Sequence, residues 1–204
     1  SDLITIIYLS MTTSYKDNIQ GKLRNMFVEK LRSTDVFISN YLDEAIDAAR
    51  KPSYEYYLER AWEQYKADGN EGRNDCYMNI SSNLRNKFFW DKRFDICAFY
   101  LEGEDNPFTY LSSNNYPMGS YMEEVHDAIN ELRKVDSSYA EVIVVDGRIF
   151  IVRNVYTISS YEKFGTLVLE LNRKNMFSDI TLDEGQFLGL CINDADGLVL
   201  KPGF

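Results

Sequence analysis

The pattern of apolar and polar residues predicts one long helix in the first quarter of the chain. Between residues 15 and 50, the positions on one face recur every three or four residues, close to a heptad spacing. These positions are Leu23, Phe27, Leu31, Thr34, Ile38, Tyr41, Ala45 and Ala49. Charged residues fill the other faces, and Pro52 ends the helix because proline lacks an amide donor. At about 1.5 Å per residue, such a helix is about 50 Å long and either projects as a stalk or pairs with a partner.

Beyond this helix, the spacing of apolar residues fits helices in some segments and strands in others. Apolar residues at helical spacing predict further helices, and they cover residues 53–67, 75–89 and 121–134, with a short one at 175–180. Compact apolar or β-branched runs predict strands, and they cover residues 94–101, 108–111, 141–145, 149–158, 164–171, 187–192 and 198–200. Asp146-Gly147, between two β-branched runs, is a strong hairpin signal.

Because hairpins join the strands, the sheet should be mainly antiparallel. The expected fold class is α+β, with a long N-terminal helix packed on the sheet and flanking helices. Three segments are expected: the long helix in 1–52, an α+β domain in 53–180, and a C-terminal hairpin in 181–204.

The chain opens on an apolar run, Leu3 to Leu9, with no initiator methionine. We expect this run to be the outer end of a membrane helix or the start of an amphipathic helix, and the chain to be a fragment of a longer protein. No run reaches the ~20 apolar residues that a membrane span needs.

Composition excludes several classes of function. Lys and Arg number 22 against 32 Asp and Glu, for a net charge of −10. This balance argues against binding to nucleic acid, because a basic surface is needed to neutralise phosphates. One histidine, His126, and three widely spaced cysteines without a CxxC pair argue against a metal site. We find no motif for catalysis or for a cofactor.

Tyrosine is the chemically informative residue type. There are 15 Tyr, 12 Phe and 2 Trp, which together make 14% of the chain. Tyr100 and Tyr110 fall on neighbouring predicted strands, and Trp90, Tyr116 and Tyr121 fall where loops or helix starts cap the sheet. These five side chains could line an aromatic cup for a small molecule. The alternative for each is an ordinary place in the core.

A second group of candidates lies in one strand. Arg153, Asn154 and Tyr156 follow an apolar run, and an unpaired guanidinium inside a sheet is expensive. Arg153 is a candidate ligand anchor, or a partner for Asp95, Glu141 or Glu170. Successive strand residues face opposite sides, so Asn154 and Tyr156 share a face that Arg153 does not.

Three stretches carry a family resemblance: the long helix with its segment 37–43, the strand 149–156 after the Asp-Gly turn, and the strand 164–172. In this arrangement the chain resembles the extracytoplasmic Cache-type (PAS-like) sensor domain of bacterial transmembrane sensor histidine kinases. The resemblance implies that residues 53–180 sense a ligand, and that 181–204 begin a membrane-proximal unit. It also implies a location on the extracytoplasmic face of the bacterial membrane.

Two hypotheses follow. In the first, the domain is non-catalytic, binds a small-molecule metabolite on one face of the sheet, and signals through the long helix to a membrane span and a kinase dimer. In the second, it is a protein-interaction module of a membrane receptor without a small ligand. In both, a homodimer forms through the N-terminal helix. A cytosolic acyltransferase is a third possibility, but its glycine-rich acyl-carrier loop is missing.

Overall fold

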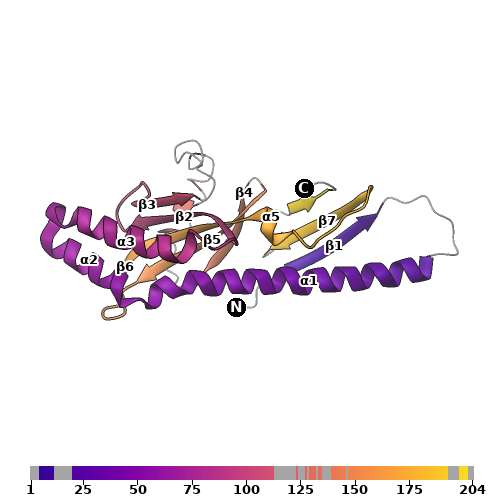
Figure 1. The fold of residues 1–204 in the computed structure, drawn as a ribbon, viewed down its shortest axis with the longest axis horizontal. Coiled ribbons are helices and arrows are strands. Elements are labelled where there is room, and N and C mark those ends of the chain that lie inside the picture. Colours follow the sequence, from indigo (N-terminus) through magenta and orange to yellow (C-terminus); the bar gives the residue numbers. More distant parts are fainter. Residues whose placement is uncertain are drawn as a thin grey trace.

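The computed structural model describes residues 5–11, 20–112, 123, 127, 129–131, 133–134, 139–145, 147–192 and 198–201. The fold is α+β, as predicted, with a long helix beside a five-stranded antiparallel sheet and a smaller, three-stranded sheet. In Figure 1, the helix runs along one side of the molecule and passes both sheets.

The long helix α1 spans Gln20–Arg50. It confirms the prediction from residue 20 onward, whereas residues 15–19 lie outside the described residues. The 3-10 turn η1, Lys51–Tyr54, follows at once and contains Pro52, so the predicted stop is confirmed. At 1.5 Å per residue, its 31 residues span roughly 46 Å.

Helices α2 Tyr56–Asp68 and α3 Arg73–Phe88 agree with the predicted 53–67 and 75–89 within three residues. The short helix α5 is Arg173–Met176, so it begins two residues earlier and ends four residues earlier than predicted. The 3-10 turn η2 Gly69–Glu71 was not predicted. In the stretch predicted as a helix at 121–134, the described residues are helical and comprise Glu123, Asp127, Ile129, Asn130, Glu131, Arg133 and Lys134.

The central sheet has the strand order β3-β2-β6-β5-β4, and every pairing is antiparallel. Its strands are β2 Phe94–Leu101, β3 Thr109–Ser112, β4 Glu141–Val145, β5 Arg148–Tyr156 and β6 Lys163–Leu171. Gly147 adopts a φ of +74° between β4 and β5. Glycine reaches this left-handed conformation without steric strain. Val145 pairs with Arg148, so the predicted hairpin between β4 and β5 is confirmed, whereas Asp146 lies outside the described residues.

The start of the chain is a strand of the smaller sheet and not the predicted helix. The strands of this sheet are β1 Thr5–Met11, β7 Gln186–Ile192 and β8 Leu198–Leu200, in the order β1-β7-β8. The opening apolar run was expected to be helical, and that expectation is wrong. Residues Thr5 to Met11 pair along their full length with β7. A run of seven residues carries no decisive period, so the distant partner strand determines its conformation.

No helix among the described residues is long and apolar enough to cross a membrane.

The predicted heptad seam of α1 packs against the protein's own core from Leu31 onward. Ile38, Ala45 and Ala49 are fully buried in the same apolar cluster as the central sheet, and Leu31 and Tyr41 pack against it partly buried. The helix contacts both β1 and β5, so it spans the two sheets. The spacing of this part of the seam therefore reflects packing within one chain.

The two faces of the central sheet differ in what covers them. Helices α1, α2 and α3 pack on one face, which we call the helix-covered face. Its buried strand residues include Cys97, Phe99, Leu101, Ile151, Val155, Leu167 and Leu169. The opposite side, which we call the second face, carries a separate cluster, and its members include Ile96, Ala98, Tyr100, Phe150, Val152, Val168 and Ile129.

The helix-covered face is tightly packed at Gly165. This residue lies under the Phe99 ring, and a Cβ atom built on it would lie 2.3 Å from Phe99 Cζ and 2.8 Å from the Tyr100 carbonyl oxygen. Real Cβ atoms do not approach other atoms so closely. The position therefore requires glycine because of packing rather than because of its backbone conformation.

A buried carboxylate fixes α2 to the connection between β5 and β6. Glu59 is almost fully buried and accepts hydrogen bonds from Ile158 N at 2.6 Å, from Ser159 N at 3.1 Å and from the Ser159 hydroxyl. Burial by itself raises the pKa of Glu59, but these three hydrogen bonds outweigh burial and lower the pKa below its ordinary value.

A cluster of polar groups fixes α1 to the central sheet. We call it the polar junction, and it consists of Tyr41, Arg93, Asp95, Asn172 and Asn175. The Tyr41 hydroxyl donates to Asn175 Oδ1 at 2.9 Å, and it lies 3.4 Å from the Arg93 carbonyl oxygen. Burial raises the pKa of Tyr41 well above its ordinary value. The junction lies where β2 begins and β6 ends.

Candidate functional site

Three polar side chains form a row across the second face. Tyr100 on β2 is the register partner of Thr166 on β6, and Thr166 is the partner of Asn154 on β5. All three are buried, and the Thr166 hydroxyl donates to Asn154 Oδ1 at 2.8 Å. We call this set the polar row. It lies on the side of the sheet that faces away from α1.

The Tyr100 hydroxyl is the unusual member of the row. The residue is fully buried, yet its hydroxyl has no hydrogen-bond partner among the described residues. A buried polar group without a partner destabilises the folded state by about 1–3 kcal/mol. Phenylalanine would fill the same space without this penalty. The hydroxyl therefore has no evident role in holding the fold together.

Arg133 lies over the ring of Tyr100. Its guanidinium carbon is 4.5 Å from the ring centroid, and its Nη2 donates to the carbonyl oxygens of Leu101 at 3.2 Å and Glu104 at 2.7 Å. Burial raises the pKa of Tyr100 to about 12, and the positive charge of Arg133 opposes that rise. The phenol is thus neutral at physiological pH and can donate a hydrogen bond.

Tyr110 extends the polar surface toward the sheet edge. It pairs with Ala98 in the β2–β3 register and packs against the second-face cluster. Burial raises the pKa of Tyr110 to about 12, and the Glu170 carboxylate adds to the rise. Glu170 is itself buried and lies 3.7 Å from Arg148 Nε. The second face therefore combines aromatic rings with hydroxyl, amide and paired charged groups.

The predicted candidates divide between the two faces and the surface. Tyr100, Tyr110 and Asn154 are brought together on the second face. Arg153 is on the helix-covered face, between Ile151 and Val155 in the alternation, and is only 7% exposed. Arg153 and Asn154 are therefore on opposite sides, as the alternation predicts.

The other candidates do not join the row. Tyr156 follows a register shift after Val155 and stacks on Tyr161, with ring centroids 5.5 Å apart. Trp90 is 79% exposed and packs edge-on against Phe89 before β2 begins. Tyr116 and Tyr121 lie outside the described residues.

Thr166 and Arg133 were missed by the sequence analysis. Thr166 is the one hydroxyl residue within the run from Phe164 to Leu169, and it follows a glycine. That interruption was an available signal. Arg133 lies in a polar helical stretch, and nothing local to it indicates contact with a strand more than 30 residues away.

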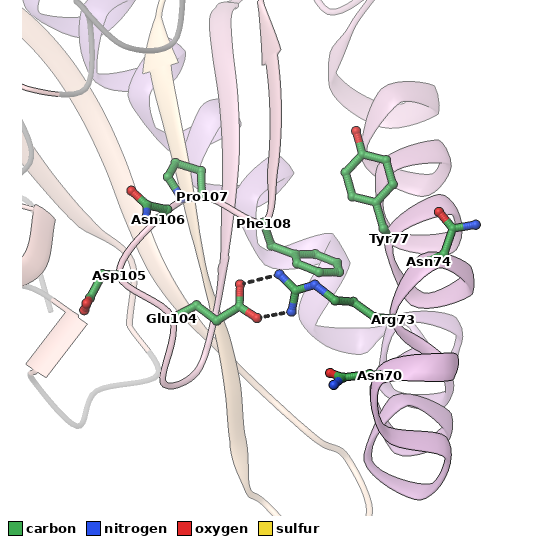
Figure 2. Close-up of a pocket in the computed structure, with 9 residues that line it drawn as sticks. All are labelled: Asn70, Arg73, Asn74, Tyr77, Glu104, Asp105, Asn106, Pro107 and Phe108. Carbon is green, nitrogen blue, oxygen red and sulfur yellow. Dashed lines mark hydrogen bonds and ion pairs between the residues drawn. The ribbon is translucent and has the colours of Figure 1, made fainter.

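A separate groove lies between the start of α3 and the loop that joins β2 to β3. It has a volume of about 640 Å³, and Figure 2 shows Arg73 reaching across it to Glu104. The two side chains pair through both guanidinium nitrogens, with Arg73 Nη2 3.0 Å from Glu104 Oε2. Arg73 also lies 5.0 Å from the Phe108 ring centroid. The charge of Arg73 thus binds the loop between β2 and β3 to α3.

The described residues also bear on the requirements of a metal site and of a reactive thiol. No three His, Cys, Asp or Glu side chains among the described residues lie close enough to hold a metal ion. Cys76 and Cys97 are buried, and burial raises the pKa of the Cys76 thiol to about 11. These two thiols are therefore uncharged at physiological pH.

Comparison with known proteins finds no family model that matches the chain and no curated protein that matches its sequence.

Proposed function

We propose that this chain is the extracytoplasmic sensor domain of a bacterial transmembrane histidine kinase, and that it binds a small-molecule metabolite on the second face. In this proposal the domain is non-catalytic and membrane-anchored in the full-length protein. The observation that carries the proposal is the polar row. It gathers buried hydrogen-bonding groups, one of them without a described partner, on the face opposite α1.

The topology of the sheet supports the resemblance to Cache-type domains. With the central strands numbered one to five in chain order, the order across the sheet is 2-1-5-4-3. An antiparallel sheet with a long N-terminal helix packed on it is the arrangement that the resemblance implies. The opposite face, against which Ile129 and Arg133 pack, is the ligand face in this proposal, and aromatic rings with a few convergent polar groups are typical of small-molecule sites.

The proposed mechanism is a shift between two arrangements of sheet and helix. A ligand that hydrogen-bonds Tyr100 and Asn154 more favourably in one arrangement raises the population of that arrangement. Helix α1 packs along the other face of the same sheet. In this mechanism its position therefore differs between the two arrangements. The helix would carry that difference toward the membrane.

A ligand screen on the purified chain tests the proposal. Thermal unfolding is followed in the presence of amino acids, organic acids, sugars and purines, and each hit is confirmed by calorimetry. We expect one class to raise the unfolding temperature. The increase should disappear in Asn154→Ala and shrink in Tyr100→Phe, whereas Tyr77→Phe, in the groove of Figure 2, should respond like the wild type.

Two results would contradict the proposal. The first is a response that all three variants retain, since binding would then occur elsewhere. The second is a complete gene that lacks both membrane spans and a kinase module. Reading the gene on each side of this segment gives that answer directly.

The alternative is an interaction module that dimerises through α1. From Leu31 onward, the seam predicted for such a dimer packs against the protein's own core, so a dimer contact along this part of α1 would use other residues. Met26, Val28 and Val36 on α1 are exposed apolar side chains and favour this alternative. Sedimentation that shows a dimer in the wild type, and a monomer in Met26→Lys, would support it.

A further inference from the structure

The polar junction connects α1 to the two strands that carry Tyr100 and Thr166. Arg93 immediately precedes β2, and Asn172 immediately follows β6. Asn172 N donates to the Arg93 carbonyl oxygen at 2.7 Å, and Asn172 Nδ2 donates to Asp95 Oδ1 at 2.9 Å. The ends of the two strands are thereby joined to each other.

Helix α1 reaches the same point through two side chains. The Tyr41 hydroxyl donates to Asn175, whose backbone N–H donates to Asn172 Oδ1 at 2.9 Å. One turn along the helix, Glu44 Oε2 lies 3.6 Å from Arg93 Nη1. Because the Tyr41 contact is partly buried and the Glu44 contact is largely exposed, Tyr41 is expected to make the stronger connection.

The backbone of β2 is irregular at this point. The β2–β6 register shifts between Phe94 and Ile96, so Asp95 is an extra residue with no direct partner in the ladder. A bulge bends a strand and redirects a side chain, and here the Asp95 carboxylate accepts from Asn172. Arg93 is held in place by Asp91, whose Oδ2 lies 2.6 Å from Arg93 Nη2.

We infer that the polar junction is the coupling point through which a change at the polar row alters the position of α1. This inference rests on the proposed sensor function. Tyr100 and Thr166 of the row lie on the two strands that the junction joins. Tyr100 is seven residues from Arg93, which immediately precedes β2, or roughly 23 Å at 3.3 Å per residue. Paired strands do not slide freely, so a displacement at Tyr100 or Thr166 is carried to their far ends, where Tyr41 connects them to α1.

Hydrogen exchange followed by mass spectrometry tests the coupling without any ligand. The change Thr166→Val removes the hydroxyl that bonds to Asn154 and keeps the side-chain shape. We expect it to alter exchange in the α1 peptide covering residues 38–50 by about fivefold, which corresponds to the lower limit of typical coupling energies. Exchange in a peptide from α3 should stay constant and serves as the control for global unfolding.

The same perturbation is then repeated in variants of the junction. When Thr166→Val is added to Tyr41→Phe, it should no longer alter hydrogen exchange in α1. The same result is expected when it is added to Asn175→Ala, which removes the acceptor of the Tyr41 hydrogen bond. Tyr56→Phe is the matched control, since it removes a hydroxyl from an exposed tyrosine, and it should leave the response intact.

Each other outcome overturns the inference. An α1 response that persists in both junction variants would mean that the change travels by another route. A response of equal size in α3 would mean that Thr166→Val acts on global stability. Absence of any α1 response in the wild-type background would mean that row and helix are not coupled. Because no ligand is used, these results are independent of the ligand screen.

Discussion

The two faces of the central sheet are built from the same strands but have different chemistry. On the helix-covered face, Phe99 closes over Gly165, and apolar side chains from three helices fill the remaining space. On the second face, Tyr100, Thr166 and Asn154 bring hydroxyl and amide groups into a buried position. Apolar packing dominates the first face, although the Arg153 side chain and the Trp62 indole nitrogen are also buried there. On the second face, the Tyr100 hydroxyl lowers stability, and it is the group that the proposed function uses.

The largest effect is expected where packing is tightest. Gly165→Ala would place a methyl group into the Phe99 ring and against a backbone oxygen, so the fold should lose about 3 kcal/mol of unfolding free energy. Urea denaturation measures the loss. Gly21→Ala is the control, because that residue lies in α1 with nothing within 4 Å, and it should gain about 1 kcal/mol. An unchanged midpoint for Gly165→Ala would mean that the helix-covered face is loosely packed.

The next largest loss of unfolding free energy is expected at Glu59, the buried carboxylate that holds α2 to the connection between β5 and β6. Glu59→Gln should remove about 2 kcal/mol at neutral pH, because an amide cannot accept all three hydrogen bonds. Since the folded pKa of Glu59 lies below its ordinary value of 4.5, its contribution is complete above that pH and is lost as the pH falls through the folded pKa.

The stability gap between wild type and Glu59→Gln should therefore narrow as the solution is acidified. Denaturation at a series of pH values measures it, with the exposed Glu63→Gln on the same helix as the control. A gap that stays constant on acidification would show that folding does not change the pKa of Glu59, and a gap that widens would show that folding raises it.

A smaller loss is expected at the polar junction. Tyr41→Phe removes the hydroxyl that donates to Asn175, and the cost should be about 1 kcal/mol. Urea denaturation is again the measurement. If the loss is absent, the hydrogen bond to Asn175 does not stabilise the attachment of α1.

The smallest effect on the free energy of unfolding is expected from a tyrosine-to-phenylalanine change on the second face. Tyr100→Phe removes a buried hydroxyl that has no described partner, so unfolding free energy should change by less than about 0.5 kcal/mol or increase. Comparison with Tyr41→Phe isolates the difference between the faces. If Tyr100→Phe destabilises the protein as much as Tyr41→Phe, the hydroxyl has a structural partner, and the functional argument for the second face fails.

Much of the fold could be predicted because its signals are local. The Asp146-Gly147 turn, the apolar strand ending at Leu101 and the helix stop at Pro52 each depend on a few neighbouring residues. The strand β1 could not be predicted in this way. Its conformation depends on pairing with β7, and no short pattern reveals a partner so far along the chain.

The candidate site was predictable only in part, for the same reason. Strand alternation separated Arg153 from Asn154, and the tyrosine content drew attention to Tyr100. Thr166 and Arg133 gain their significance from contacts across strands and from a distant helical stretch. Such contacts follow from tertiary packing. The residues next to Thr166 and Arg133 in the sequence carry no signal of it.

The pairing of β1 with β7 also has a kinetic consequence. Thr5 pairs with Ile192 and Met11 with Gln186, so the partners are about 180 residues apart. Contacts of such long range form slowly, because the loop must close before the pairing stabilises it. During synthesis, β1 emerges long before its partner, and its apolar residues Ile6, Ile7 and Leu9 remain unpaired until most of the chain is made. The smaller sheet should therefore be the last part to fold and the most exposed to aggregation.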